Sequence, residues 1–497
     1  MITISKLNES TIRVISDDGV EQELRDFFTF DVPGAKHTPL FKAKIWDGKI
    51  RLYDIHRKTL AKGLYDYVIR FCERNGYQYK DDGVVVTKTD IAPSKVHEFV
   101  SWLNLCTRGT PLQVRDYQLE AIYHSIKEER TLLLSPTASG KSLIIYSLMR
   151  YHLEHGRRCV IIVPTTSLVE QMYTDFQDYS SGNGWEVGKR CQKLYSGFTK
   201  DVSSEVLITT WQSIFKQPAA WFKQFDVVFG DEAHLFKAKS LTHVMDGMTT
   251  ARYRIGTTGT IDSKNAHKLV LEGVFGPVHK VITTKELMEN NQVANLRIKC
   301  LMLKYDQETR SLMSKAKYQD EMNFIVQHKQ RNKFLRNLAI SCEGNTLLLF
   351  QYVDKHGKIL HDMIKSKVGD TRKVHFIYGG TDVEDREEAR KIADVNDDVI
   401  IIASYGVFST GVNIPSIENI IFASPSKSKI RNLQSIGRGL RLKNGKTHCT
   451  LFDISDDMSW KSRKNHTMNH LIERLKTYSE EQFKYKLLEI DLENTSA

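Results

Sequence analysis

The stretch Ser135-Pro136-Thr137-Ala138-Ser139-Gly140-Lys141-Ser142 is the part of the sequence that decides the fold. An apolar run before it, Thr131–Leu134, predicts a buried strand, and the run after it, Leu143–Met149, predicts a helix. A tight loop between a strand and a helix N-terminus is the setting in which backbone N–H groups bind phosphate. We therefore expect this loop to hold a nucleotide, with Lys141 at the β- and γ-phosphates and Ser142 on Mg²⁺.

Apolar strands and helical segments alternate in two long stretches of the chain, at about 110–285 and 335–455. Alternation of this kind is typical of a parallel sheet with helices on both faces. The N-terminal residues instead show short alternating strands and an amphipathic helix, which predicts a small α+β domain. We thus predict an α/β protein with an N-terminal domain at 1–95, a first parallel-sheet domain at 96–285, a helical bridge at 286–335, a second parallel-sheet domain at 336–455 and a basic helical tail at 456–497. The apolar stripe of that tail would consist of Leu471, Leu475, Phe483, Leu487 and Leu488.

The composition limits the class of protein. The chain has 497 residues, of which 41% are hydrophobic and 26% charged, and its net charge is +11. That surplus of cations favours a polyanionic partner, nucleic acid before membrane. No apolar run approaches the roughly 20 residues of a membrane span, and the N-terminus shows no signal-peptide pattern. Seven scattered cysteines without a CxxC pair predict reduced thiols in a cytosolic protein.

A second motif, Asp231-Glu232-Ala233-His234, follows the apolar strand Phe225–Gly230. An acidic pair at the end of a strand, downstream of a phosphate loop, is typical of the other half of an NTPase site. Asp231 is predicted to hold Mg²⁺, and Glu232 is predicted to polarise the attacking water as a general base. A nucleoside triphosphate and Mg²⁺ are therefore the expected ligands.

The N-terminal domain carries cations around an aromatic residue. The segment Lys42–Ile45 and the strand Lys49–Tyr53 predict a β-hairpin, with its turn at Trp46–Lys49. The basic face of this hairpin, suited to nucleic acid, would consist of Lys42, Lys44, Trp46 and Lys49. The alternative is a solvated surface with the indole packed beneath it, and the sequence leaves both interpretations open.

Together with seven further motifs, these features make the chain similar to superfamily 2 helicases of the DEAH-box type. The resemblance runs through both parallel-sheet domains, with the motifs in the order that the family shows. The further motifs are Arg115–Gln118, Val163–Leu168, Thr209–Ser213, Thr257–Thr260, Phe350–Tyr352, Ser404–Pro415 and Gln434–Arg441. The resemblance implies two tandem RecA-like motor domains that hydrolyse ATP with Mg²⁺ and move along nucleic acid.

The resemblance also implies a role for individual residues. Gln118, with Arg115, would select adenine, and hence ATP. Arg438 and Arg441 would act as arginine fingers on the γ-phosphate, and their spacing places both on one helix face. Further nucleotide contacts would come from Thr137, Ser139, Gly140, Gly411 and Gln434. Contacts to the nucleic-acid backbone would come from Pro164, Thr165, Thr209, Gln212 and Thr410.

The N-terminal segment Phe41–Leu52, ahead of the motor motifs, narrows the resemblance to phage recombination helicases. That resemblance implies an ATP-dependent DNA helicase for branch migration, fork regression, and D-loop and R-loop unwinding, in recombination, repair and replication. The expected partners are branched, duplex and single-stranded DNA and RNA–DNA hybrids, bound by a monomer in the cytoplasm of the host cell. An RNA helicase, a duplex translocase of the restriction-enzyme kind, and an ATP-gated clamp or annealing protein remain open alternatives.

Overall fold

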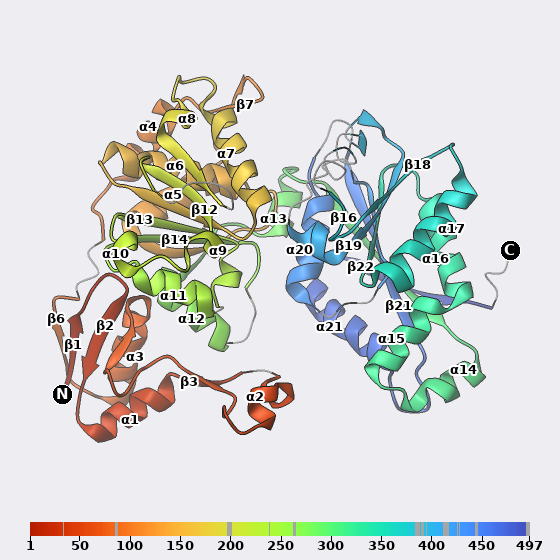
Figure 1. Ribbon diagram of the computed structural model, residues 1–497, viewed down its shortest axis with the longest axis horizontal. Coiled ribbons are helices and arrows are strands. Elements are labelled where there is room, and N and C mark those ends of the chain that lie inside the picture. Colours follow the sequence, from red (N-terminus) through yellow and green to blue (C-terminus); the bar gives the residue numbers. More distant parts are fainter. Residues whose placement is uncertain are drawn as a thin grey trace. The chain divides into compact units, whose positions relative to one another are not determined.

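The computed structural model describes residues 1–32, 34–84, 88–195, 201–237, 239–261, 265–382, 388, 392, 393, 395–410, 417–424, 426, 428–442 and 446–493. Backbone contacts divide the chain into two compact units, Met1–Ser135 with Gly140–Ile282, and Pro136–Ser139 with Thr283–Ala497 (Figure 1). Among the described helices, none combines the length and the apolar character that crossing a membrane demands.

The N-terminal residues form an α+β domain around a four-stranded sheet in the order β5-β2-β1-β6. Alternate residues of β1 and β2 point to one face of this sheet, where Ile4 and Ile12 are buried together with Val68 and Phe71 of α3. The predicted small α+β domain is therefore present. Its elements are β1 (Ile2–Lys6), β2 (Thr11–Ile15), α1 (Asp18–Phe27), β5 (Thr59–Ala61), α3 (Tyr65–Asn75) and β6 (Tyr79–Asp82).

Between α1 and β5 the chain forms an arm, residues 29–51, which carries β3 (Thr29–Asp31), α2 (Pro39–Lys42) and β4 (Lys49–Arg51). The predicted hairpin is wrong, because β4 pairs antiparallel with β3 and not with the segment 42–45. A proline opens α2, and the side chain of Thr38 caps that helix by accepting a backbone N–H. Proline and a capping threonine thus start a helix where the lysine and apolar alternation predicted a strand.

The first parallel sheet, in the same unit, has the strand order β11-β12-β10-β13-β14-β9-β15. Its strands are β9 (Arg130–Leu134), β10 (Cys159–Val163), β11 (Cys191–Leu194), β12 (Val206–Thr210), β13 (Val227–Asp231), β14 (Tyr253–Thr258) and β15 (Val278–Lys280). One apolar core lies under α4 (Pro93–Trp102), α5 (Asp116–Glu128), α6 (Lys141–Glu154), α7 (Thr166–Ser180) and α8 (Val187–Arg190). A second core lies on the other face, under α9 (Trp211–Ile214), α10 (Ala219–Phe222), α11 (Lys239–Gly247) and α12 (Asn265–Phe275). Both faces are covered, as a parallel sheet requires.

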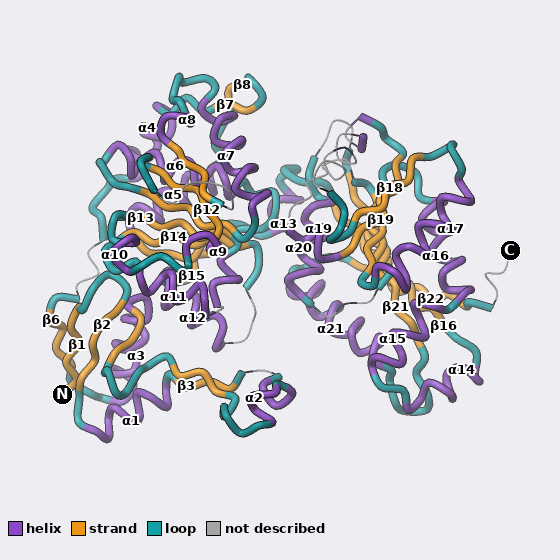
Figure 2. Tube along the Cα trace, in the orientation of Figure 1, coloured by secondary structure: helices purple, strands orange, loops and turns teal. Residues whose placement is uncertain are grey.

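The second unit holds another parallel sheet, in the order β18-β19-β17-β20-β21-β16-β22, drawn in orange in Figure 2. Its strands are β16 (Asn295–Lys304), β17 (Thr346–Phe350), β18 (Lys373–Ile377), β19 (Val399–Ser404), β20 (Asn419–Phe422), β21 (His448–Asp457) and β22 (Tyr485–Asp491). One face packs on α15 (Tyr318–Gln327), α16 (Lys329–Ser341) and α17 (Lys358–Val368). Other α-helices of this unit, among the described residues, include α13 (Thr284–Glu289), α14 (Gln307–Leu312), α19 (Tyr405–Thr410), α20 (Lys429–Gly439) and α21 (His466–Glu480).

Two predicted helical segments contain strands of the second sheet. The bridge, 286–335, includes β16, which pairs in parallel along its whole length with β21. The tail, 456–497, includes β22, which pairs with the other edge of β16. Leu487 and Leu488 therefore lie on an edge strand and not on the predicted helical stripe, whose helix ends at Glu480. Both strands were missed because buried and exposed residues do not alternate cleanly along them. Strand β16 is long, and strand β22 is mostly exposed.

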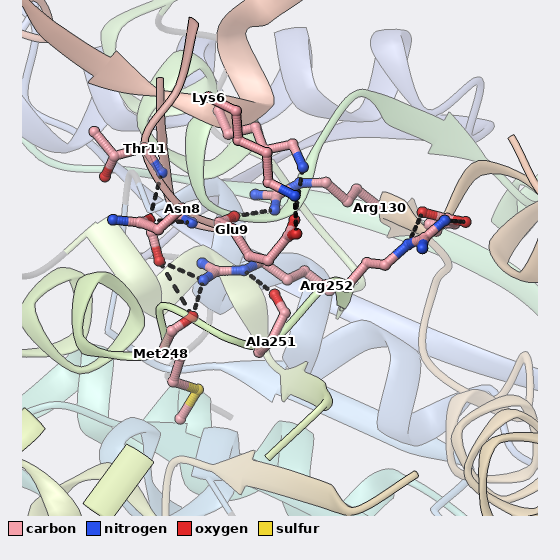
Figure 3. Close-up of polar contacts among 12 residues, drawn as sticks. Lys6, Asn8, Glu9, Thr11, Arg130, Met248, Ala251 and Arg252 are labelled. Carbon is pink, nitrogen blue, oxygen red and sulfur yellow. Dashed lines mark hydrogen bonds and ion pairs between the residues drawn. The ribbon is translucent and has the colours of Figure 1, made fainter. Parts of the chain in front are cut away.

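The N-terminal domain and the first parallel sheet meet in a buried polar contact (Figure 3). Arg130, at the start of β9, donates to the carbonyl oxygen of Glu9 at 2.7 Å, and Arg254 of β14 donates to the Ser10 hydroxyl. The Glu9 carboxylate pairs with the ammonium group of Lys62 at 2.6 Å. Since Arg130 and Arg254 are neighbours in the register of β9 and β14, the domain is fixed to the two strands that lead into the site described below.

Candidate nucleotide and nucleic-acid sites

The predicted phosphate loop lies between β9 and α6, as the sequence indicates. Gly140 caps α6 with φ 84°, and a β-carbon there would lie 2.3 Å from the side-chain nitrogen of Gln118, so only glycine fits. The loop is tied to β14 because the Ser135 N–H donates to the carbonyl oxygen of Thr258 at 2.8 Å. Lys141 donates to the Ser135 carbonyl oxygen at 3.4 Å. Backbone N–H groups at the start of α6 are thus presented at a helix N-terminus.

The residues predicted to contact the base and the loop interior lie around this turn. Gln118 is buried on α5, and its Oε1 accepts the Arg115 N–H at 3.0 Å in a helix cap. The Arg115 guanidinium donates to the Tyr117 hydroxyl at 2.9 Å. Ser139 is buried, and its hydroxyl donates to the Pro136 carbonyl oxygen at 2.7 Å. Gln118 and Gly140 are therefore brought together, as a base-reading glutamine beside a phosphate loop requires.

The acidic motif begins at the last residue of β13. Asp231 is buried and accepts a hydrogen bond from the Thr257 hydroxyl at 2.7 Å. Burial first, and then the charge of Glu232, raises the pKa of Asp231 above its ordinary 3.8, while the nearby Lys141 opposes this shift. A buried carboxylate with too little local positive charge is a place where a cation is stabilising.

The residues present fit a magnesium ion. Ser142 offers a hydroxyl at the start of α6, and it is hydrogen-bonded to the Tyr179 hydroxyl at 2.9 Å. A serine hydroxyl and a carboxylate, with water and phosphate oxygens, are the hard oxygen ligands that Mg²⁺ prefers. Asp231 and Ser142 are thus the residues that would hold the ion. No pattern in the sequence indicates Tyr179, since it lies on α7, far along the chain from Ser142.

Glu232 and His234 connect the acidic motif to β14. Glu232 has a left-handed backbone, φ 50°, which is uncommon for this residue type and frequent at functional sites. The Nδ1 atom of His234 lies 3.3 Å from a Glu232 carboxylate oxygen and 3.1 Å from the Thr258 hydroxyl. That hydroxyl donates to the Thr260 carbonyl oxygen at 2.9 Å. The glutamate is therefore linked through one imidazole to the segment that follows β14, a role for His234 that the sequence reading missed although the residue belongs to the motif.

The second unit carries the arginine motif on α20. Gln434 is half-buried on this helix and Arg438 lies near its end. The prediction that both arginines share a helix face is wrong, because α20 ends at Gly439 and Arg441 follows it. Close packing explains the glycine, because a β-carbon at Gly439 would lie 2.6 Å from the Ile420 side chain and 2.7 Å from the Cys449 sulfur. Thr410 is the last residue of α19, and Gly411 lies outside the described residues.

The predicted backbone contacts of the first unit follow two neighbouring strands, β10 and β12. Thr165, after Pro164, caps α7 by accepting the Leu168 N–H at 3.3 Å. Gln212 is exposed at the start of α9. Thr209 is fully buried and its hydroxyl donates to the Leu194 carbonyl oxygen at 2.7 Å, so this side chain holds β11 to β12 and does not face a strand of nucleic acid.

The arm presents the predicted cations at its surface. Lys42, Lys44 and Lys49 are exposed, and the Trp46 indole N–H donates to the carbonyl oxygen of Lys49 at 2.8 Å. The sequence reading missed the apolar side chains between them, since 76% of Ile45 and 53% of Leu40 is exposed. Large apolar side chains this exposed, among cations, indicate a binding surface. The sequence indicates them only by the position of Leu40 and Ile45 close to lysines.

Three comparisons with known proteins agree with this organisation. Residues 2–82 match the family described as the N-terminal domain of DNA helicase UvsW. Residues 111–263 match the res subunit of type III restriction enzymes, and residues 330–443 match the helicase conserved C-terminal domain.

Among individual proteins, the ATP-dependent DNA helicase uvsW of Enterobacteria phage T4 is 33% identical over 501 residues, which cover 97% of this chain and 98% of that protein. The crystal structure of T4 UvsW, at 31% identity, covers 99% of both chains with a TM-score of 0.53. The DNA 3'-5' translocase XPB2 of Sulfurisphaera tokodaii is 23% identical, over 67% of this chain and 80% of its own.

Proposed function

The chain belongs to the UvsW family of ATP-dependent DNA helicases, and we propose that it acts on branched DNA. The proposed activities are branch migration, fork regression and the unwinding of D-loops and R-loops. The observation that carries this proposal is the arm, where exposed Ile45 and Leu40 stand among Lys42, Lys44 and Lys49. An apolar tip flanked by cations suits a place where bases are unstacked beside a charged backbone, as they are at a junction.

Nucleotide binding falls to the loop and its neighbours. Backbone N–H groups at the start of α6 and the ammonium group of Lys141 bind the β- and γ-phosphates. Gln118 reads the adenine edge from its place beside Gly140, with Arg115 holding the start of α5. Thr137 and Ser139 shape the loop. Ser142 and Asp231 would hold Mg²⁺, which neutralises charge on the phosphates when it is bound.

Hydrolysis is proposed to start at Glu232. Its carboxylate accepts a proton from a water molecule as the water oxygen bonds to the γ-phosphorus and the bond to the bridging oxygen of ADP breaks. The imidazole of His234 orients this carboxylate, at 3.3 Å. Arg438 and Arg441, with Gln434 and Gly411, are the contribution of the second unit, and guanidinium groups stabilise charge that develops on the γ-phosphoryl oxygens.

Contacts to the DNA backbone are proposed at the strand ends. In the first unit Pro164, Thr165 and Gln212 are the proposed residues, and in the second unit Thr410. Backbone contacts of this kind position a strand without reading its sequence. The arm of the N-terminal domain adds Lys42, Lys44, Lys49 and Trp46, and the Arg130 and Arg254 contacts fix that domain to strands β9 and β14.

The test is the ATP hydrolysis rate over a panel of nucleic acids, with Lys141→Ala as the blank. The panel contains single-stranded DNA, plain duplex, three-way and four-way junctions, and an RNA–DNA hybrid loop. We expect the strongest stimulation from junctions and hybrid loops, together with strand exchange in gels. Stimulation by RNA alone would indicate an RNA helicase. Hydrolysis by the Lys141→Ala variant would contradict the proposed ATP site.

The arm is tested in the same panel by a variant that changes only its apolar tip. Replacing Leu40 and Ile45 by serine keeps every lysine, so the net charge is unchanged. We expect this variant to lose the preference for junctions over single strands while single strands still stimulate hydrolysis. A retained junction preference would remove the arm from the proposal and leave the motor assignment in place.

A further inference from the structure

Two hollows lie next to each other on the second unit, on the outer side of α15, α16 and α17. Their volumes are about 560 Å³ and 580 Å³, and they share Gln327 and Lys329 as lining residues. None of the residues assigned above lines either hollow. We call them the Phe324 hollow and the lysine hollow. Each is large enough to take a nucleobase, since ligand pockets of some 300–1,000 Å³ bury whole small molecules.

The Phe324 hollow has an aromatic wall. Phe324 and His328 line it, their rings 5.3 Å apart, and the His328 ring is held from behind by Tyr305 at 5.1 Å. The Nδ1 atom of His328 accepts the Arg331 N–H at 3.2 Å, which caps α16 and fixes the imidazole. The two ring planes are tilted by 50°, so a flat base can stack on the Phe324 ring while the fixed imidazole borders it.

The lysine hollow has an apolar floor and a cationic rim. Ile359 and Met363 of α17 give the floor, and the rim consists of Lys329, Lys333 and Lys355. Asn332 also lines it, with only 3% of its surface exposed, and its Oδ1 accepts no hydrogen bond from the described residues. The floor suits an apolar group and the rim suits an anion.

The charges around the lysine hollow are not balanced within the unit. Lys329 and Lys333 lie in the first turns of α16, which has no acidic residue in its first turn. Cations at a helix N-terminus oppose the helix dipole, which favours an anion there. In the described part of the chain, the nearby Asp354 pairs with Lys358 at 2.6 Å, and no carboxylate pairs with the three rim lysines. An anionic partner would therefore satisfy both the lysines and the helix end.

We propose that the two hollows form a binding site for single-stranded nucleic acid. One base stacks on Phe324, and its neighbour lies on Ile359 and Met363. The linking phosphate meets Lys329, the residue that both hollows share. Unpaired bases are required, because a duplex keeps its base faces stacked and offers only phosphates. The inference rests on the proposed DNA function and deepens it by assigning a separated strand to this face of the second unit.

The first experiment measures binding of labelled oligo-dT by fluorescence anisotropy over a range of salt. The variant carries Lys329→Ala, Lys333→Ala and Lys355→Ala, and the matched control carries Lys365→Ala, Lys367→Ala and Lys373→Ala, which removes the same charge from the same unit. Each single-strand phosphate contact adds roughly 0.7 to the slope of log K against log salt, so we expect the variant slope to fall by at least that amount, the share of the linking phosphate, and the control slope to stay.

A second variant separates stacking from charge. Phe324→Leu keeps an apolar side chain and the net charge, but it removes the ring. We expect its affinity for oligo-dT to fall about tenfold, the loss typical of one stacked base, while its salt slope remains that of the wild type. Blunt duplex of equal length should bind the variant as tightly as the wild type. Equal melting temperatures by circular dichroism exclude misfolding.

A direct readout uses the unaltered protein. Oligo-dT with 5-iodouracil at one position should photocrosslink to the peptide that contains Phe324 and His328. An unchanged salt slope in the lysine variant, or crosslinks confined to other peptides, would overturn the site and leave the proposed function standing. Competition by poly-glutamate as strong as by oligo-dT, with Phe324→Leu without effect, would instead assign the surface to an acidic protein segment. Absence of DNA binding by the wild type would overturn both proposals.

Discussion

The two parallel sheets of the molecule hold their buried aspartates in opposite ways. In the first sheet, Asp231 ends β13 with the Thr257 hydroxyl and a backbone N–H as partners, and no guanidinium of the described chain pairs with it. In the second sheet, Asp453 and Asp456 of β21 each meet a buried guanidinium, at 2.8 Å from Arg474 and 2.6 Å from Arg331. The charge of Asp231 in the first sheet therefore has no guanidinium to compensate it, whereas both aspartates of the second sheet have one.

The compensated pairs serve the fold. Asp453 and Asp456 differ in parity along β21, so their side chains point to opposite faces of the sheet. One therefore fastens α21 through Arg474, and the other fastens α16 through Arg331. Burial opposes the charge of Arg331, but the charge of Asp456 keeps the pKa of Arg331 above its ordinary value.

The contrast separates structural charge from functional charge. A buried carboxylate that pairs with a cation of the same chain has its charge compensated in the folded state, and the pair holds two elements together. A carboxylate such as Asp231, next to a phosphate loop, is complete only when a ligand brings the positive charge. Substitutions at the two kinds of position should therefore change stability in opposite directions.

The largest effect is expected from breaking a compensated pair. Arg331→Met leaves the buried charge of Asp456 with the Tyr305 hydroxyl but without its cation, and losing one member of a buried ion pair costs about 3–5 kcal/mol. Hydrogen exchange of the β21 amides measures the stability of this unit, and urea unfolding followed by circular dichroism measures the whole chain. We expect faster exchange throughout β21 in the variant.

The control removes both charges. The double variant Arg331→Met with Asp456→Leu replaces the pair by apolar side chains of similar size, and such replacements are often neutral or stabilising. Recovery of most of the lost stability would show that the cost of the single variant lies in the unpaired charge. Equal destabilisation of the single and double variants would mean that packing, and not charge, is what Arg331 contributes.

Asp231→Asn is expected to act with the opposite sign. The folded pKa of Asp231 is raised above the unfolded value, so the folded protein binds the proton more tightly than the unfolded chain does. Stability contributed by this group is therefore constant below about pH 4 and decreases as pH rises through the folded pKa. At pH 7 the asparagine variant should be the more stable protein, and it should hydrolyse no ATP.

The measurement is the melting temperature of both proteins from pH 4 to pH 8. The stability difference should grow with pH, and it should reverse when Mg²⁺ and a non-hydrolysable ATP analogue are added. At roughly a hundred times Kd, a ligand that binds only the folded state adds about 2.7 kcal/mol, and the wild type alone should gain it fully. A variant that is less stable at every pH would place Asp231 among the compensated aspartates.

The sequence closely predicts the part of the first sheet that carries the phosphate loop. Strand, loop and helix at 131–149 lie where expected. A buried apolar run followed by a glycine with positive φ is compatible with only this local structure. Asp231 also lies where its motif predicts, at the end of β13. These features are local, and a local pattern is readable from consecutive residues.

The errors concern features that depend on distant partners. Strand β16 pairs with β21 and β22, more than a hundred residues further along the chain. The sequence of β16 does not indicate which strands it pairs with. The pairs Arg331–Asp456 and Arg474–Asp453 are likewise brought together only by the fold. At the arm, two local signals competed, and the Thr38 cap with its proline outweighed the strand pattern.

The smallest effect is expected at an exposed pair on the same sheet. Lys304 of β16 and Glu489 of β22 lie 2.6 Å apart, as close as Arg331 and Asp456, but their side chains are 45% and 60% exposed. Water already solvates both charges, so the pair gains little by forming. Lys304→Gln should therefore change the free energy of unfolding by no more than about 0.5 kcal/mol, and by less at high salt.

A double-mutant cycle with Glu489→Gln isolates the interaction of this pair from the loss of each side chain. A coupling energy near zero, beside several kcal/mol for Arg331 with Asp456 at the same separation, would show that burial and not distance sets the value of these pairs. A coupling as large as that of the buried pair would mean that the edge strand β22 is held by charge. An exposed ion pair would then stabilise the fold as much as a buried one. Burial alone would no longer explain why the charge of Asp231 differs from those of Asp453 and Asp456.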